Sequence, residues 1–324
     1  MTQTLADLSN VTVLVVGDLM LDRYWWGDVE RISPEAPVPI VRLARTSVSA
    51  GGAANVSANI GGLGAKAVLL GITGDDPESA ELENILAAQT GVEAHLVRFS
   101  DRPTTVKTRI VAHNQHVVRL DREIADKITD EQAGVLVDRL RSLVDGVDAV
   151  IVSDYAKGML TEHVIAQLIA AANAAAKMVF VDPKGKDFTK YRGATMITPN
   201  LLEAANACGL ELNDPKLVAH AGTSMLEQFD LSHVLITEGA NGMTLFDPDG
   251  VGHHLDAYAR NVYDVTGAGD TVIATFAVAA GSGMSFIEAA QLANIAAGIA
   301  VGQVGTAVVT RSQIEIALGS GSAR

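Results

Sequence analysis

The sequence predicts an α/β protein with a doubly wound, mostly parallel main sheet and a small separate β-sheet, called the lid below, formed by two separated segments. Short, continuous apolar runs rich in β-branched residues occupy positions 11–16, 67–71 and 149–153, and such runs are typical of parallel strands buried on both faces. Beyond the lid segments these runs alternate with helical patterns, which favours right-handed β-α-β connections. Segments 20–45 and 98–122 instead alternate polar and apolar residues, which indicates the strands of the lid.

The individual helices and strands follow from local patterns along the chain. A capping box at 129–132 predicts a helix start, and alternation on either side of residues 113–114 predicts a hairpin. We expect helices at 51–60, 76–89, 129–143, 161–177 and 271–278. Further strands are expected at 105–111, 115–120, 178–181, 196–198 and 233–237. The strands of the main sheet end in polar or glycine-rich residues, and ligands bind outside the carboxyl ends of such strands, so we expect the functional site there.

Composition and charge limit the possible partners. The chain has 324 residues and a net charge of −14, and only 4% of its residues are aromatic. We therefore expect no nucleic-acid partner, because the negative net charge disfavours a phosphate backbone and few aromatic rings are available to stack on bases. The single cysteine, Cys208, excludes a disulfide within the chain. The first basic residue is Arg23, and the apolar stretch at 295–301 is too short to span a bilayer. We expect one domain over 1–324, in the cytoplasm, without a membrane partner.

The segment 264–270 (DVTGAGD) is the strongest candidate for a reaction centre. Gly267 and Gly269 allow a tight turn close to a ligand, and the amides of Ala268, Gly269 and Asp270 are expected to be unpaired donors of a first helical turn. Such donors bind an anion with the help of the helix dipole. A carboxylate beside an anion site suggests that Asp270 is a general base for an attacking hydroxyl. The alternative is that Asp270 simply caps the helix.

Polar residues in the first part of the chain are candidates for binding a sugar. Asp18 and Asp22 follow the first strand, where they can hydrogen-bond a polyol, although ordinary turn chemistry explains them equally well. Asn55 lies in the first turns of the helix opened by Gly51 and Gly52. Its amide can donate to a sugar hydroxyl or accept from one.

Four cations are candidates for holding a phosphate. Because the net charge of −14 repels an anionic substrate at long range, such a substrate needs a local basic cluster. Lys107, Arg109 and Arg119 lie on the predicted lid hairpin, where alternation places Lys107 and Arg109 on one strand face. Lys157 follows the core strand at 149–153. The alternative is that the lid residues are ordinary solvated charges.

Segments 264–270 and 51–60 resemble the C-terminal and N-terminal signatures of the ribokinase-like (PfkB) carbohydrate kinases. Two signatures in the right order are far more specific than one short glycine motif. Thr275 departs from the pattern, since the family prefers Ala or Gly at this position. The resemblance implies a ribokinase-like fold in which the small sheet serves as a lid, with ATP and Mg²⁺ as cofactors. It also implies Asp270 as catalytic base and the turn 267–270 as the anion hole.

The resemblance also implies nucleotide and metal sites. Asn200 and Glu203, spaced N-x-x-E, resemble the motif that orders Mg²⁺ and phosphate through water, although this spacing alone also fits a simple helix start. The loop at 237–239 resembles the nucleotide-binding loop. The residues implied to bind ATP are Lys184, Asn200, Glu203, Thr237, Glu238, Gly239, Gly242 and Asn294. Asp264, Thr266 and carbonyls near Gly305 resemble the loop that holds a monovalent cation such as K⁺ in some relatives.

Further segments resemble one subgroup of the family, which phosphorylates the C1 hydroxyl of D-glycero-β-D-manno-heptose 7-phosphate in lipopolysaccharide core biosynthesis. They are residues 17–27, 31–39, 153–158 and 191–195. The resemblance implies that Lys157 and the lid cations hold the distal phosphate. It also implies a homodimer through the lid, which carries Trp25 and Trp26. Many relatives carry a fused adenylyltransferase domain, which we do not expect here because the chain ends shortly after Val309.

Two alternative functions stay open. One is another ribokinase-like kinase, acting on ribose, fructose or a nucleoside, and the other is a catalytically inactive regulator that binds sugar phosphates. The lid cations favour a phosphorylated substrate, and Asp270 beside an intact glycine turn favours catalysis. A Rossmann oxidoreductase is excluded, because the fingerprint G-x-G-x-x-G does not occur.

Overall fold

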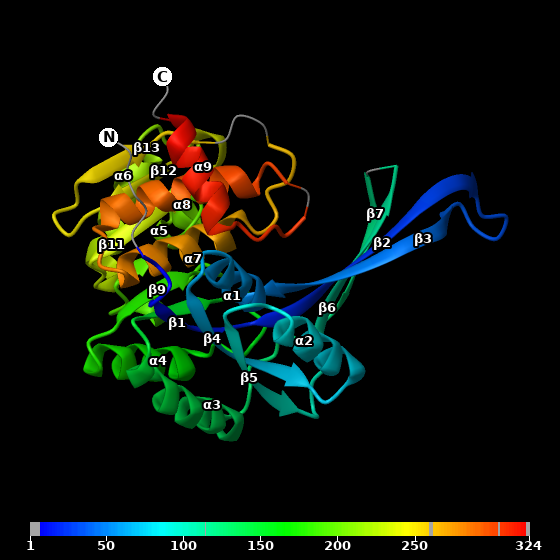
Figure 1. Ribbon diagram of the computed structural model, residues 1–324, viewed down its shortest axis with the longest axis horizontal. Helices are drawn as coiled ribbons and strands as arrows, with labels where there is room; N and C mark the ends of the chain where they lie inside the picture. Colours follow the sequence, from blue (N-terminus) through cyan, green and yellow to red (C-terminus); the bar gives the residue numbers. More distant parts are fainter. Residues whose placement is uncertain (1–6, 114, 259–261, 304, 322–324) are drawn as a thin grey trace.

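The computed structural model describes residues 7–113, 115–258, 262–303 and 305–321, and its centre is a nine-stranded sheet (Figure 1). In spatial order the strands are β13 (Gly252–Leu255), β12 (Met243–Phe246), β11 (His233–Thr237), β10 (Met196–Ile197), β9 (Met178–Asp182), β8 (Ala149–Ser153), β1 (Thr12–Gly17), β4 (Lys66–Gly74) and β5 (Val92–Phe99). The strands from β11 to β5 are parallel, whereas β12 and β13 pair antiparallel at one edge. The carboxyl ends of the parallel strands therefore lie along one side of the sheet.

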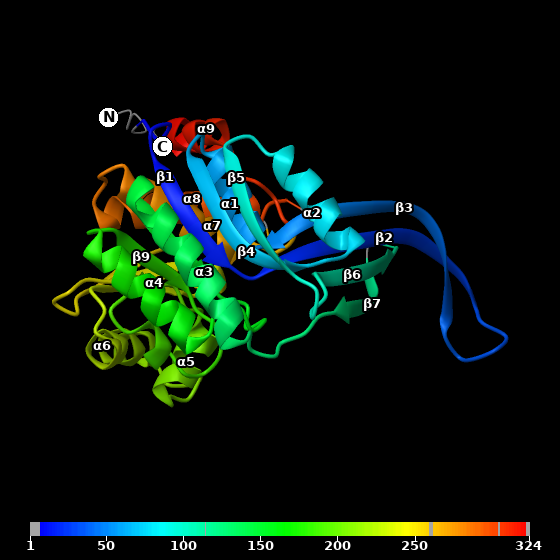
Figure 2. The same ribbon diagram turned by 90° about the horizontal axis from the view of Figure 1, so that it is seen from below.

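Helices cover both faces of this sheet, because its strands bury side chains on both sides. In β1, Val13 and Val15 pack into one apolar core, and Leu14 and Val16 pack into the other, as the two-residue period of a strand requires. The first core is completed by α1 (Ala53–Gly62), α2 (Pro77–Ala87), α7 (Ala268–Gly281), α8 (Phe286–Ala300) and α9 (Arg311–Gly321). The second is completed by α3 (Asp130–Leu143), α4 (Glu162–Ala174), α5 (Leu201–Cys208) and α6 (Leu217–Phe229), which Figure 2 shows grouped together. Within the described ranges, no helix is long and apolar enough to cross a membrane.

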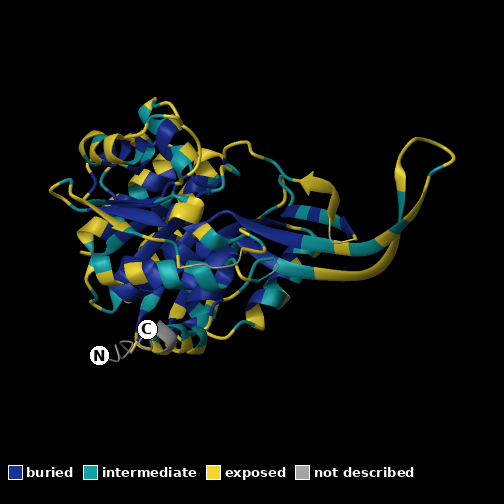
Figure 3. Ribbon diagram, turned by 90° about the horizontal axis from the view of Figure 1, so that it is seen from above, coloured by how far each residue is buried: buried dark blue, intermediate teal, exposed yellow. Residues whose placement is uncertain are grey.

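A second, four-stranded sheet, called the lid sheet below, extends from the body as a long arm (Figure 1). Its strands, in spatial order, are β3 (Pro39–Gly52), β2 (Leu19–Ile32), β6 (Thr105–Ala112) and β7 (Gln115–Arg122). The two hairpins are antiparallel, and β2 joins them by pairing with β6 in parallel. Arg23 and Arg122 tie the base of the lid sheet to α2 through ion pairs with Asp76, Glu78 and Glu81. Figure 3 shows that exposure increases from this base toward the tip.

The predicted fold class is confirmed, and the differences lie at the edges of the sheets. The hairpin expected around residues 113–114 is present, although residue 114 itself lies outside the described residues. Residues 98–99, expected in the second lid segment, belong to β5, because they pair with Thr73 and Gly74 of β4. Strands β5, β12 and β13 have no predicted counterpart. Strands β5 and β13 form the two edges of the sheet, where exposure interrupts the continuous apolar runs that mark the central strands, whereas β12 is buried but only four residues long.

Candidate active site

The candidate reaction centre lies where α7 begins. Gly267 precedes the first turn of this helix with a left-handed backbone, at φ 77° and ψ 6°. A Cβ at this position would lie 2.8 Å from the side-chain nitrogen of Asn55. The positive φ and the close approach therefore both require glycine. This turn places the segment 264–270 directly against α1, the helix that follows Gly51 and Gly52.

The turn offers fewer backbone donors than we expected. The Ala268 amide, predicted to be unpaired, donates to the Val265 carbonyl at 3.2 Å. The reason is that residues 265–268 close a β-turn before the helix starts. The amides of Gly269 and Asp270 have no hydrogen-bond partner in the part of the chain that the structure describes. These two donors and the positive end of the α7 dipole are what the turn presents to an anion.

The carboxylate of Asp270 is buried and held by two side chains. Asn55 Nδ2 donates to its Oδ2 at 2.7 Å, and the Tyr155 hydroxyl donates to its Oδ1 at 2.7 Å. Burial raises the pKa of Asp270 to about 6, although these two hydrogen bonds act to lower it. A carboxylate with such a pKa is largely ionised at neutral pH, as a general base must be.

Asp18 lies just beyond the carboxyl end of β1 and organises the loop that follows β8. Its Oδ2 accepts from the amides of Tyr155 and Lys157, at 2.9 and 3.0 Å. Burial, with a smaller contribution from the Asp154 charge, raises the pKa of Asp18 to about 6 against these hydrogen bonds. The carboxylate therefore joins the N-terminal strand to the loop that carries Lys157.

Asp22 is buried at the base of the lid sheet and pairs with a predicted phosphate-binding cation. The Arg109 guanidinium forms an ion pair with its Oδ1. Asp22 and Arg109 come from the neighbouring strands β2 and β6. A Cβ on Gly51 would collide with the Asp22 carboxylate, and one on Gly52 would collide with the Asp18 carbonyl oxygen. The glycine pair therefore lets β3 pass close to both carboxylate residues.

Lys107 of the lid sheet and Lys157 of the main domain meet at one carboxylate. Glu123 accepts from Lys107 Nζ at 3.2 Å and from Lys157 Nζ at 2.7 Å. Arg119 is exposed and donates to both carboxylate oxygens of Asp121, and one of them, Oδ2, also lies 3.5 Å from Lys107 Nζ. The structure thus brings Lys107 and Lys157 together and leaves Arg119 at the rim of the cluster.

Four of the candidate ATP-binding residues lie together at the ends of β9, β10 and β11. Asn200 and Glu203 form a capping box, in which each side chain accepts from the other residue's amide, so the helix-start interpretation is correct for their local structure. The remaining Glu203 oxygen, Oε1, accepts from Lys184 Nζ at 2.8 Å. An isolated parallel β-bridge also pairs Asn200 with Thr237. Glu203 is therefore already engaged by its own helix and by Lys184.

The other nucleotide candidates lie around β12 and β13. Glu238 accepts from the Thr244 hydroxyl at 2.5 Å. Asn294 of α8 donates to the Asp256 carbonyl at 2.7 Å. Gly239 and Gly242 both have positive φ in the loop between β11 and β12. These residues line the antiparallel edge of the main sheet, next to the four described above.

The candidate cation loop is closed by Asp264. Its carboxylate accepts from the amides of Thr266 and Gly305, both at 2.9 Å. Burial acts to raise the pKa of Asp264, but these hydrogen bonds outweigh it and the pKa is lowered. Within the described ranges, this loop included, no group of three or more His, Cys, Asp and Glu side chains is arranged to hold a metal ion.

Two residues without a predicted role lie beside Asp270. Tyr155 donates to it, as described above. Asp182 ends β9, and a Cβ on Gly269 would lie 3.9 Å from its carboxylate. Burial, followed by the charges of Asp270 and Glu203, raises the pKa of Asp182 well above its usual range. Asp182 could have been predicted in the same way as Asp18, because both lie at the carboxyl end of a parallel strand, where ligands bind. The contact between Tyr155 and Asp270 could not, because no local sequence spacing indicates it.

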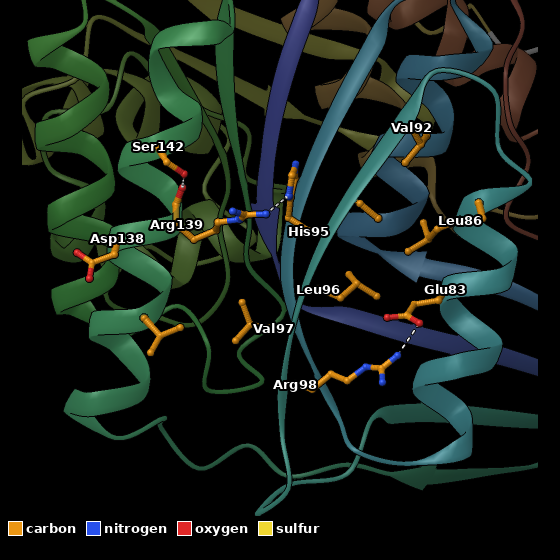
Figure 4. A pocket seen from close by; sticks show the side chains of 13 residues that line it. Glu83, Leu86, Val92, His95, Leu96, Val97, Arg98, Asp138, Arg139 and Ser142 are labelled. Atoms are coloured by element: carbon orange, nitrogen blue, oxygen red, sulfur yellow. Dashed lines mark hydrogen bonds and ion pairs between the residues drawn. The ribbon is translucent and has the colours of Figure 1, made fainter.

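A hollow elsewhere on the main sheet is separate from these residues. It measures about 910 Å³ and lies between α2, the edge strand β5 and α3 (Figure 4). In Figure 4, Arg139 reaches His95 from α3, and Arg98 pairs with Glu83 of α2. None of the candidate site residues lines it. A much smaller hollow beside Asp18 does include a candidate, Lys157.

Comparisons with known proteins agree with this architecture. The profile of the pfkB family of carbohydrate kinases matches residues 11–312. The chain is 48% identical over 306 residues to the "Bifunctional protein HldE" of Pseudomonas savastanoi pv. phaseolicola, covering 94% of this chain and 63% of that protein. It is 45% identical over 318 residues to the protein of the same name from Ectopseudomonas mendocina, covering 98% and 66%. The chain thus spans a little less than two thirds of the length of these relatives.

Solved structures show the same fold at low sequence identity. Ribokinase from Arabidopsis thaliana, complexed with ribose and ATP, superposes with a TM-score of 0.77 at 21% identity, covering 95% of this chain and 99% of that one. Phosphofructokinase-2 from Escherichia coli, in complex with fructose-6-phosphate, superposes with a TM-score of 0.76 at 16% identity, covering 97% and 99%. The family profile and the identity to the HldE proteins together show that the chain belongs to the pfkB family of carbohydrate kinases.

Proposed function

We propose that this chain transfers the γ-phosphoryl group of ATP to the C1 hydroxyl of D-glycero-β-D-manno-heptose 7-phosphate, in the biosynthesis of ADP-heptose for the lipopolysaccharide core. The observation that carries the proposal is a group of cations near Asp270: Lys107 and Lys157 share Glu123, and Arg109 pairs with Asp22. Lys157 follows by two residues Tyr155, whose hydroxyl contacts Asp270. In a chain with a net charge of −14, such a cluster suits a substrate with a phosphate away from its reacting hydroxyl. Identity of 43–48% to the HldE proteins supports it.

Asp270 is the proposed base. Its carboxylate takes the proton of the sugar hydroxyl while the hydroxyl oxygen bonds to the γ-phosphorus, the bond to the bridging oxygen breaks, and ADP leaves. The Gly269 and Asp270 amides stabilise the transferring group, since donors fixed at a helix N-terminus need no reorganisation during the reaction. Such positioning and charge stabilisation account for most catalysis in phosphoryl transfer. Gly267 serves by allowing the turn, and Ala268 forms part of it.

The sugar phosphate is proposed to lie between the base and the lid sheet. Asp18, Asp22 and Asn55 supply carboxylate and amide groups for its hydroxyls. Its distal phosphate replaces carboxylates as the partner of the lid cations, because a phosphate carries more charge and more acceptor oxygens than Glu123. Closure of the lid sheet over the sugar excludes water, which competes as an acceptor.

ATP is proposed to bind along the ends of β9 to β12. Lys184 suits the phosphates, and the residues from Thr237 to Gly242 form the loop beside them. Bound with ATP, Mg²⁺ supplies charge neutralisation, and Glu203 lies where it can act on the metal through water. A monovalent cation such as K⁺ is proposed in the loop that Asp264 joins to Gly305, where backbone carbonyls would hold it.

A second copy of the chain is the proposed protein partner. The lid sheet exposes large apolar side chains on three of its strands, including Trp25 of β2 at 38%, Leu43 of β3 at 54% and Leu120 of β7 at 52%. Exposed apolar patches of this kind often mark interfaces. A homodimer through the lid sheets would cover them. Because ATP and sugar phosphates are cytoplasmic metabolites, we also propose that the enzyme acts in the cytoplasm.

The test is ADP release from Mg-ATP with a panel of acceptors. The panel contains the heptose, its 7-phosphate, ribose, fructose and fructose 6-phosphate. The proposal predicts that the heptose 7-phosphate gives the highest kcat/KM. A higher value for another sugar would identify a different ribokinase-like kinase. Sugar-phosphate binding without ADP release from any acceptor would support the inactive regulator instead.

A further inference from the structure

Tyr155 lies in a loop whose shape is fixed by several hydrogen bonds. Its amide and that of Lys157 donate to Asp18, and the Ala156 amide donates to Asp154 Oδ1 at 2.7 Å. Ala156 has a positive φ of 55°, an unfavourable conformation for a residue with a Cβ. A single residue held in this way indicates that the surrounding bonds determine the path of the loop. The Tyr155 ring therefore leaves the loop in a defined direction, toward α7.

The Tyr155 hydroxyl reaches the proposed base. It donates to Asp270 Oδ1 at 2.7 Å, while Asn55 donates to Oδ2 at the same distance. Each carboxylate oxygen thus has one fixed donor and keeps capacity for a further one. Rotation of an aspartate carboxylate about its terminal bond is otherwise only weakly restricted. Two donors on opposite oxygens remove that freedom.

We infer that Tyr155 is a positioning residue for Asp270, whose hydroxyl fixes the rotation of the carboxylate and stabilises its ionised form. The inference rests on the proposed role of Asp270 as base. Burial, followed by the charge of Asp270, keeps the pKa of Tyr155 well above its usual value, so the hydroxyl remains a donor throughout the working pH range. A reacting hydroxyl then meets a carboxylate that is already oriented and ionised.

The groups around Asp270 act on its ionisation in opposite directions. Asp22 from β2 and Asp182 from β9 oppose it by charge repulsion. Asn55 from α1 and Tyr155 from the loop after β8 favour it by hydrogen bonding. Without the Tyr155 hydroxyl, Asn55 is the one remaining side chain in contact with Asp270 that stabilises the ionised carboxylate against the effect of burial. The carboxylate should then take up a proton at higher pH.

The test compares Tyr155→Phe with the parent enzyme in the full chain, using kcat/KM for the sugar phosphate as a function of pH. The acid limb of the profile should move to higher pH by about one unit, the usual effect of one hydrogen bond on a carboxylate. At pH 7 we expect kcat to fall about tenfold, about twofold from the smaller ionised fraction and the rest from the lost orientation of the carboxylate, while KM for ATP stays unchanged. Tyr191→Phe is the matched control, because its hydroxyl donates to Asp154 at 2.7 Å and not to Asp270. Its acid limb should not move.

An unshifted acid limb in Tyr155→Phe would overturn the inference. So would a lower KM for the sugar with unchanged kcat, since the hydroxyl would then only compete with the substrate. Asp270→Asn separates this failure from failure of the proposed base. If that variant keeps turnover within tenfold of the parent, the base assignment itself fails. If it is inactive while the Tyr155→Phe profile is unshifted, only the role of Tyr155 is wrong.

A second measurement covers the case in which Tyr155→Phe does not fold. Biosynthetic replacement of tyrosine by 3-fluorotyrosine keeps the ring and makes the phenol a stronger donor. Tyr155 is then the modified hydroxyl that contacts Asp270, and the Tyr191→Phe background removes the modified hydroxyl that would contact Asp154. The acid limb should then move to lower pH. A limb that stays in place or moves to higher pH would contradict the inference.

Discussion

The side-chain amide of Asn55 donates to the carboxylate of Asp270 at 2.7 Å, although 215 positions separate the two residues in the chain. Asn55 and Asp270 are each the third residue of a helix that follows a glycine, Gly52 or Gly267, and the contact explains sterically why Gly267 must be glycine. The two glycine motifs are therefore halves of one site. Asn55 also opposes the effect of burial on the Asp270 carboxylate.

Replacing Asp270 by Asn should stabilise the fold at alkaline pH. Burial raises the folded-state pKa of Asp270 from 3.8 to about 6, so its contribution to stability is fully present below pH 3.8 and is lost as the pH rises through 6. Asn can keep both hydrogen bonds, because the Tyr155 hydroxyl can accept as well as donate. The gain in unfolding free energy should be about 1 kcal/mol larger at pH 8 than at pH 5.

Urea denaturation of both proteins at the two pH values measures this difference. Asp18, whose pKa is also raised to about 6, is present in both proteins, so its titration cancels. An equal gain at pH 5 and pH 8, or a variant less stable than the parent at pH 8, would show that the buried carboxylate is not the cause.

Replacing Lys157 or Arg109 by Ala should reduce the preference for phosphorylated heptose over free heptose. A hydrogen bond between charged groups contributes about 1.5–3 kcal/mol, which corresponds to a loss of about tenfold or more in the ratio of the two kcat/KM values. Lys157→Ala is the cleaner variant, because Lys107 still neutralises Glu123, whereas Arg109→Ala leaves the buried Asp22 without its ion-pair partner.

Steady-state kinetics with both sugars measures the ratio, and KM for ATP should change little. Arg42→Ala is the control, since this residue is also an ion-paired arginine of the lid sheet but lies exposed on β3, next to Glu30. If the ratio is the same in the parent, Lys157→Ala and Arg42→Ala, the cations do not recognise the distal phosphate.

Replacing Glu203 by Gln should raise the Mg²⁺ concentration needed for half-maximal rate several-fold. Gln preserves the capping box with Asn200, so the start of α5 should be retained. The substitution therefore isolates the loss of charge beside Lys184 from loss of the helix cap. Rates are measured over a Mg²⁺ titration at fixed ATP. Glu131→Gln, an exposed residue in the first turn of α3, is the control. Matching titrations for all three proteins would remove Glu203 from the metal site.

Replacing Thr275 by Val should stabilise the protein by about 1 kcal/mol, because a buried hydroxyl without a partner carries a desolvation cost that a methyl group does not. Thr275 is 1% exposed, and its Oγ1 has no hydrogen-bond partner among the described residues. Thr271→Val is the matched control on the same helix, since the Thr271 hydroxyl is buried but bonded to the Gly267 carbonyl at 3.1 Å. Chemical denaturation should show a gain for the first and a loss for the second. A loss of similar size in both would contradict the argument.

The sequence was informative where function depends on local spacing. Continuous apolar runs predict β1, β4 and β8, and the glycine pairs predict the turns before α1 and α7. Because Asp18 follows the first predicted strand, the sequence also places it correctly at the carboxyl end of the parallel strands. Departure of Thr275 from the family pattern is visible in the sequence, and its hydroxyl is indeed left without a partner in the described structure.

Features set by long-range packing could not be predicted. The Tyr155 hydroxyl meets Asp270 across 115 positions, and Glu123 joins Lys107 to Lys157 only because the lid sheet folds against the main domain. The bond between the Ala268 amide and Val265 depends on the exact turn geometry, which spacing does not specify. Edge strand β5 was missed because its exposed face interrupts the apolar pattern.

The central claim is phosphoryl transfer to C1 of a heptose that already carries a 7-phosphate, and phosphorus NMR of the product tests it directly. The enzyme is incubated with Mg-ATP and D-glycero-β-D-manno-heptose 7-phosphate, with Asp270→Asn as the control. We predict that one ADP appears for each new sugar phosphate, with coupling of the new phosphorus to the anomeric proton, and that Asp270→Asn forms product about 10²–10⁴-fold more slowly. ADP without a sugar bisphosphate, or an equal rate with the unphosphorylated heptose, would contradict the account.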